Sequence, residues 1–152
     1  MVSTLRIFDA DILAYALYDG SPAHEASWGH LRGLIEGGLS VSVTPATVLE
    51  TYNTLFWFYR VRPMRSLLEK LELLLEAFRV VESPLSGFKI SLAENIPLGD
   101  GFLVASALQH NIPIVVSNDR YVLGCVEKYG LIGENPVPKE VRASLSEWSN
   151  PL

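Results

Sequence analysis

The sequence predicts an α/β protein, a three-layer α/β/α sandwich around a central, mainly parallel sheet. Short runs of β-branched and other apolar residues alternate with longer segments of helical spacing along the whole chain, and this alternation is typical of a parallel sheet wrapped by helices. The 152 residues suffice for one domain that buries roughly two-thirds of its unfolded surface. No linker or internal repeat interrupts the pattern, so residues 1–152 are expected to form a single domain.

The first strand and two helices are expected before residue 39. Residues 5–9, "LRIFD", form a short apolar run that predicts a buried strand, and 12–18 begin a helix. A second helix is expected to take Ser21 as its N-cap and Pro22 as its first helical residue. Its helical spacing of apolar residues ends at the glycine pair 37–38, which stops a helix because glycine favours the chain reversal there.

A second strand and two more helices follow. The alternation of "LSVSV" (39–43) predicts the strand. Thr44 and Pro45 are a favourable helix start, and that helix is expected to run to about Arg60. Pro63 then begins another helix, "MRSLLEKLELLLEAF", which is rich in leucine and glutamate.

The last third of the chain repeats the alternation of strand and helix. "IPIVVSND" is the clearest strand of the sequence, since it is β-branched and ends in polar residues. The expected elements are a strand at 79–82, a helix at 84–94, a helix beginning near Asp100, a strand at 112–119, a helix at 120–130, and a short amphipathic helix in the tail after residue 134.

Composition excludes several classes of protein. Hydrophobic residues make up 49% of the chain, which argues against disorder. With 17 acidic and 12 basic residues the formal charge is −5, so no general basic footprint for nucleic acid is present. The single Cys125 excludes an internal disulfide framework and a cysteine-rich zinc site. No signal peptide or membrane span is recognisable, and we expect a cytoplasmic protein with no membrane partner.

Acidic residues stand where the expected parallel strands end. Asp9 ends the first strand, Asp119 ends the "IPIVV" strand, Asp100 starts the helix before that strand, and Glu50 lies in the helix after the second strand. In open parallel sheets ligands bind beyond the carboxyl ends of the strands. Four carboxylates meeting there would repel one another, and Mg²⁺ or Mn²⁺ relieves that conflict because these cations prefer oxygen ligands.

Three motifs in order resemble the PIN-domain family of metal-dependent ribonucleases, in particular its small VapC-like toxin members. "FDADILAYAL" resembles the family's opening Asp-x-Asn motif, with Asp9 as the acid and Asp11 where asparagine is common. "TPATVLETYN" resembles the second motif and places its acid at Glu50. "LGDGFLVASALQHNIPIVVSND" is the most specific stretch, and it assigns the remaining acids to Asp100 and Asp119. The resemblance covers nearly the whole chain.

This resemblance implies a Mg²⁺- or Mn²⁺-dependent endoribonuclease, with the same four acids as catalytic residues and metal ligands. It implies RNA products with 5′-phosphate and 3′-hydroxyl ends, regulation by a small antitoxin protein, and a homodimer. RNA processing outside a toxin role stays open. The supporting residues that it implies around the acids are Asp11, Ser117 and Asn118.

A phosphatase of the haloacid-dehalogenase type is the alternative enzyme. "DAD" resembles that family's first motif, in which Asp9 would be the nucleophile and Asp11 an acid-base, and "LGDGF" resembles its late Gly-Asp motif. The likeness then fails, because position 104 is valine where that family has a further acid. Glu50 and Asp119 would also have no role.

Other interpretations concern single residues or the whole scaffold. Asp11 is explained nearly as well as a helix cap. Arg60, Arg62 and Arg65 form the chain's only basic cluster, which is either a solvated face or a set of RNA phosphate contacts. A degenerate PIN scaffold that only binds protein is the non-enzymatic alternative.

Overall fold

The computed structural model describes residues 5–145 and confirms the three-layer α/β/α class. Five strands form one sheet in the order β3-β2-β1-β4-β5, and each neighbouring pair is parallel. Each parallel connection therefore crosses over through helices, as the alternating sequence predicts. The strands are β1 Arg6–Phe8, β2 Val41–Val43, β3 Arg79–Val80, β4 Ile114–Val116 and β5 Ile132–Glu134.

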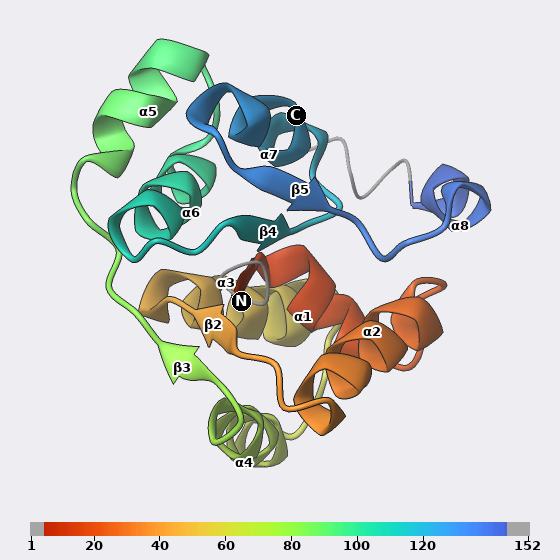
Figure 1. Cartoon of the computed structure of the whole chain (residues 1–152). Helices are drawn as coiled ribbons and strands as arrows, with labels where there is room; N and C mark the ends of the chain where they lie inside the picture. The colour runs from red at the N-terminus through yellow and green to blue at the C-terminus, as the bar shows by residue number, and fades with distance from the viewer. Residues whose placement is uncertain (1–4, 146–152) are drawn as a thin grey trace.

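Helices cover both faces of this sheet. In Figure 1 the strands lie through the middle, with α5 and α6 on one side and α2 and α8 on the other. The helical elements are α1 Ala10–Leu17, α2 His24–Glu36, α3 Pro45–Asn53, the π-helix η2 Thr54–Phe58, α4 Met64–Leu75, α5 Gly87–Glu94, α6 Leu98–Gln109, α7 Arg120–Cys125, the 3₁₀-helix η3 Val126–Tyr129 and α8 Lys139–Ser144.

The period of two along each strand divides the core into two layers. In β1, Phe8 packs in the cluster that includes Leu31 of α2, whereas its neighbour Ile7 packs in the cluster that includes Leu103 of α6. Ile7 and Phe8 are both fully buried, as expected for a strand covered by helices on both faces. Such burial holds the carboxyl end of β1, and therefore Asp9, in a fixed place.

Several expected boundaries are wrong. The second helix begins at His24 with Ala23 as its N-cap, and not at Pro22, because Ser21 instead closes a turn by accepting the Ala23 N–H at 3.1 Å. Thr44 is the N-cap of α3 as expected, and accepts the Thr47 N–H at 3.1 Å. The expected helix to Arg60 becomes a π-helix after Asn53 and ends at Phe58.

Strand β5 was not expected from the sequence. "IGE" is only three residues long and contains a glycine, so it carries no strand pattern of its own. It forms because Ile114 and Val116 of β4 offer a free edge with which Ile132 and Glu134 pair. The short tail helix is confirmed as α8, while the expected tail beyond residue 145 lies outside the described residues.

None of the helices within residues 5–145 has the length and apolar content that a membrane crossing requires.

Candidate metal centre

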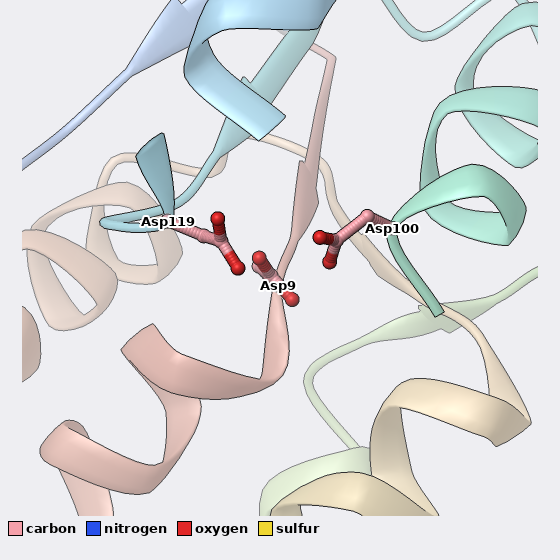
Figure 2. A group of neighbouring side chains, drawn as sticks. All are labelled: Asp9, Asp100 and Asp119. Atoms are coloured by element: carbon pink, nitrogen blue, oxygen red, sulfur yellow. The ribbon is translucent and has the colours of Figure 1, made fainter. Parts of the chain in front are cut away.

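Three of the four predicted acids lie together at the carboxyl edge of the sheet. Asp9 follows β1, Asp119 follows β4, and Asp100 is in the first turn of α6. One carboxylate oxygen of each lies within 4.8 Å of those of the other two, and Figure 2 shows the three side chains converging. The register causes this convergence, since Phe8 pairs with Val116 and so places the residues after both strands side by side.

Hydrogen bonds fix the orientation of Asp9. Its Oδ1 accepts the Ala10 N–H at 2.7 Å, and its Oδ2 accepts the Ser117 hydroxyl at 2.7 Å. The Ser117 Oγ in turn accepts the Asp119 N–H at 2.9 Å. Ser117 therefore links two of the three acids, and its own N–H is satisfied by the Glu134 carbonyl at 3.0 Å.

Burial and crowding favour the protonated forms of Asp9 and Asp100. Asp9 and Asp100 are buried, at 8% and 7% exposure. Burial, with the charges on Glu50 and Asp119, raises the pKa of Asp9 to about 7, although its bond from Ser117 opposes the rise. Burial, then the charges on Asp9, Asp119 and Glu50, raise the pKa of Asp100 to about 9. Shifts of this size are the usual cost of bringing carboxylates together without a cation.

Asp100 supplies the observation that fits a cation best. Its Oδ2 is a buried oxygen without a hydrogen-bond partner among the described residues. An unpaired buried carboxylate oxygen is costly, and a hard divalent cation satisfies it along with the facing oxygens of Asp9 and Asp119. The three residues therefore fit Mg²⁺ or Mn²⁺ in donor type and in mutual distance.

Glu50 approaches the site from α3 but is outside the three-acid group. Its side chain is exposed as a whole, yet its carboxylate lies against Gly99, where an added Cβ would come 2.5 Å from Oε1. That partial desolvation, together with the charge on Asp119, raises the pKa of Glu50. Glu50 is thus a neighbour of the acid cluster.

Asp11 is not the helix cap. Asp9 is the N-cap of α1, and Asp11 lies in its first turn. Asp11 Oδ1 accepts the Ile12 N–H at 2.7 Å, and Oδ2 accepts the Asn118 N–H at 3.0 Å. Burial and the charge on Asp9 raise the pKa of Asp11. The second aspartate therefore ties α1 to the loop that carries Asp119.

Asn118 also contacts two residues that the sequence analysis did not single out. Its Nδ2 donates to the Tyr15 hydroxyl at 3.4 Å, and its Oδ1 accepts the Asn135 Nδ2 at 2.9 Å. The only sequence signal for Asn135 is a polar residue before a proline, which predicts a turn and nothing more.

The three predicted arginines are not one free basic patch. Arg62 Nη1 donates to the Phe56 carbonyl at 2.5 Å and to the Val61 carbonyl at 3.0 Å, and its guanidinium lies 3.6 Å from the centre of the Phe56 ring. Arg65 pairs with Glu69 at 2.9 Å. Arg60 is exposed, with a positive φ of 60°.

Comparison with known proteins bears on the family and the fold of the chain. A family model described as the PIN domain matches residues 6–123. No curated protein matches the sequence.

Similar solved structures include three that share the fold at low sequence identity. FitAB bound to an IR36 DNA fragment is 20% identical with a TM-score of 0.65, covering 87% of this chain and 95% of that one. PAE2754 from Pyrobaculum aerophilum is 20% identical with a TM-score of 0.63, covering 94% and 88%. VapBC2 from Rickettsia felis, bound to a DNA fragment from their promoter, is 14% identical with a TM-score of 0.62, covering 86% and 97%.

Proposed function

The chain belongs to the PIN-domain family, and from that premise we propose that it is a Mg²⁺- or Mn²⁺-dependent endoribonuclease, the toxin of a toxin–antitoxin pair. The observation that carries the proposal is the cluster of Asp9, Asp100 and Asp119, with the unpartnered buried oxygen of Asp100 inside it. A bound divalent cation supplies water of lowered pKa and neutralises charge on phosphoryl oxygens.

Residues of the protein orient the carboxylates of this centre. Asp9, Asp100 and Asp119 would hold the cation, and Glu50 would act beside them, on a cation or on a water. Ser117 keeps one oxygen of Asp9 in place through its hydroxyl. Because both Asp9 oxygens accept hydrogen bonds, one from the first residue of α1 and one from Ser117, the carboxylate presents its remaining lone pairs in a fixed direction.

Asp119 supports the nuclease over the phosphatase alternative. A phosphatase centred on Asp9 gives no role to Asp119, yet an oxygen of Asp119 lies within 4.8 Å of oxygens of both Asp9 and Asp100. Turnover of p-nitrophenyl phosphate that is lost on changing Asp9 and indifferent to Asp119 would instead favour the phosphatase. A purely protein-binding scaffold has no need for acids whose pKa values are raised by burial and mutual repulsion.

Replacement of Asp100 by asparagine tests the proposal. Asp100→Asn keeps the size of the side chain but removes a carboxylate, so cleavage of a labelled single-stranded RNA in Mn²⁺ should fall about 100-fold or more. The fold should be retained, as shown by an unchanged circular dichroism spectrum. Asp19→Asn is the matched control, since Asp19 is exposed and outside the cluster. Full activity of Asp100→Asn would remove the basis of the proposal.

Partners form a further part of the proposal. The FitAB and VapBC2 structures are of complexes bound to DNA, and by that likeness we propose an antitoxin partner and a homodimer for this chain. An apolar groove of about 640 Å³ between α1, α2 and α4, lined in part by Leu17, Trp28 and Leu73, supports a protein partner. Sedimentation of the purified chain tests the dimer, and a monomer at micromolar concentration would contradict it.

A further inference from the structure

A chain of hydrogen bonds connects the end of β5 to the loop that carries Asp119. Asn135 Nδ2 donates to Asn118 Oδ1 at 2.9 Å, although the two residues are 17 positions apart. Asn118 is buried at 8% exposure and lies between Ser117, which bonds Asp9, and Asp119 itself. A displacement of Asn118 therefore moves its two chain neighbours, Ser117 and Asp119, which belong to the acid centre.

Asn135 is itself held firmly. Its Oδ1 accepts the Val137 N–H at 3.0 Å, which closes the turn after β5. The residue before it, Glu134, accepts two bonds from Arg6 at 2.9 and 3.1 Å and lies 2.6 Å from His30 Nε2. The backbone before Asn135 is thus held to β1 and α2 through the contacts of Glu134 with Arg6 and His30.

Asn135 also decides how the Asn118 amide is turned. An amide has one acceptor oxygen and one donor nitrogen. When Oδ1 accepts from Asn135, the Nδ2 group is directed to the Tyr15 hydroxyl, 3.4 Å away. In this orientation the Asn118 backbone N–H donates to Asp11 Oδ2 at 3.0 Å. The Asn118 side chain is therefore held by Asn135 and Tyr15, and its backbone N–H by Asp11.

We infer that Asn135 is a positioning residue for the acid centre, which holds the Ser117–Asp119 loop in place through the Asn118 side chain. The inference rests on the proposed nuclease function, but it concerns a residue whose side chain bonds Asn118 and Val137 and acts on the acids only through Asn118. Small displacements of groups at an active site reduce rates strongly, and supporting contacts of metal ligands are worth about 10- to 100-fold.

Two substitutions at position 135 isolate the contact. Asn135→Ala removes both side-chain bonds, whereas Asn135→Asp keeps an oxygen for the Val137 N–H and replaces the donor to Asn118 with a negatively charged carboxylate oxygen, which repels Asn118 Oδ1. Both variants should lower kcat for single-stranded RNA in Mn²⁺ by about 10-fold, with KM changed less than 2-fold. Gln109→Ala is the control, since it removes an exposed amide at the opposite end of α6 from Asp100 and should match the wild type.

Two more measurements distinguish positioning from a general loss of structure. In the metal-free protein the backbone N–H groups of Asn118 and Asp119 should exchange with solvent at least 5-fold faster in both variants, while those of Ile7 and Val104 in the core keep the wild-type rate. If Asn135 acts through Asn118, the double variant Asn118→Ala/Asn135→Ala should lose no more activity than Asn118→Ala alone.

The outcomes separate the inference from the function on which it rests. Wild-type exchange at Asn118 and Asp119 in both variants, wild-type kcat, or fully additive losses in the double variant would each overturn the role of Asn135. A wild-type protein without nuclease activity would overturn the proposed function, and the exchange rates would still decide whether Asn135 holds the loop. If Asn135→Ala does not fold, Asn135→Asp carries the test, because the Val137 bond is retained.

Discussion

Gly99 leaves room for the carboxylate of Glu50. An added Cβ at position 99 would lie 2.5 Å from Glu50 Oε1, which is closer than any ordinary contact. The atom that it meets is at the end of a flexible side chain, so α6 need not move and the glutamate would rotate away. Glycine one residue before Asp100 is therefore a condition for Glu50 to reach the acid cluster.

Gly99→Ala should reduce cleavage without unfolding the protein. We expect about a 10-fold lower kcat, because the Glu50 carboxylate is displaced while its charge is retained, and a Tm within about 2 °C of the wild type. Gly33→Ala is the matched control, since nothing lies within 4 Å of its added Cβ and it is in the middle of α2. That control should stabilise the protein by about 0.5–1 kcal/mol at unchanged activity. Unchanged kcat in Gly99→Ala would mean that Glu50 has no part in the reaction.

Individual residues of the site were predictable when their place followed from a strand end. Asp9 and Asp119 follow strands whose apolar pattern is visible in the sequence, so their meeting at one edge could be predicted. The contact between Asp11 and the Asn118 N–H could not, because it joins residues 107 positions apart through the path of a loop. The contact of Asn135 with Asn118 had no sequence signal for the same reason.

Arg62 closes the carboxyl end of the π-helix η2. Its guanidinium lies over the Phe56 ring and donates to the carbonyls of Phe56 and Val61. Carbonyl groups at a helix end lack intrahelical partners. Arg62 Nη1 bonds one of these, that of Phe56, together with the Val61 carbonyl beyond the helix, while the planar guanidinium stacks on the aromatic ring. Arg62 is therefore engaged within the protein, which favours a structural role over contact with RNA.

Replacement of Arg62 separates these two roles. Arg62→Ala should lower the free energy of unfolding by about 1–2 kcal/mol, and Arg62→Lys should recover less than half of it because lysine lacks the planar guanidinium that stacks on the Phe56 ring. Arg65→Ala removes only an exposed pair with Glu69 and should cost less than about 0.5 kcal/mol. Chemical denaturation measures all three. Wild-type stability of Arg62→Ala, with weaker RNA binding, would restore the RNA-contact interpretation.

The elements were predicted as well as their local patterns allowed. Strands β1 and β4 and helix α6 have apolar runs that only a buried element explains, and they lie where expected. The start of α2 was wrong because Ser21 serves equally well to cap a helix or to close a turn. Strand β5 was missed because its three residues, two of them exposed, owe their conformation to pairing with β4.

The fold as a whole was predictable because burial on both faces of a parallel sheet leaves a strong sequence pattern. The same fold creates a conflict at its carboxyl edge, where the ends of β1 and β4 and the first turn of α6 bring Asp9, Asp119 and Asp100 to one place. Repulsion between the ionised carboxylates therefore destabilises the folded state. The free energy of unfolding must depend on how this charge is neutralised, by protons or by a cation.

Without metal, the protein should become less stable as the pH rises. The pKa of Asp9 is raised from 3.8 to about 7 and that of Asp100 from 3.8 to about 9. Between the ordinary pKa of each aspartate and its raised value, the native state binds more protons than the unfolded chain. The free energy of unfolding therefore falls as the pH rises through this range. The opposite contribution of Glu134, whose pKa is lowered by bonds from Arg6 and His30 against the effect of burial, is already complete at pH 5.5.

Mg²⁺ should restore the stability that the metal-free protein loses at high pH. Its effect should be larger at high pH, because the cation replaces the protons that Asp9 and Asp100 otherwise hold. In thermal unfolding of chelator-treated protein, Tm should fall by about 4 °C or more from pH 5.5 to pH 8.5. Addition of 10 mM Mg²⁺ should raise Tm more at pH 8.5 than at pH 5.5. Asp100→Asn should weaken the dependence of Tm on pH, because it removes one repelling carboxylate. Without metal, the Tm of this variant at pH 8.5 should be higher than that of the wild type. Asp19→Asn should behave as the wild type. A Mg²⁺-induced shift that is equal at both pH values, or absent, would mean that protons and cation do not compete for Asp9 and Asp100.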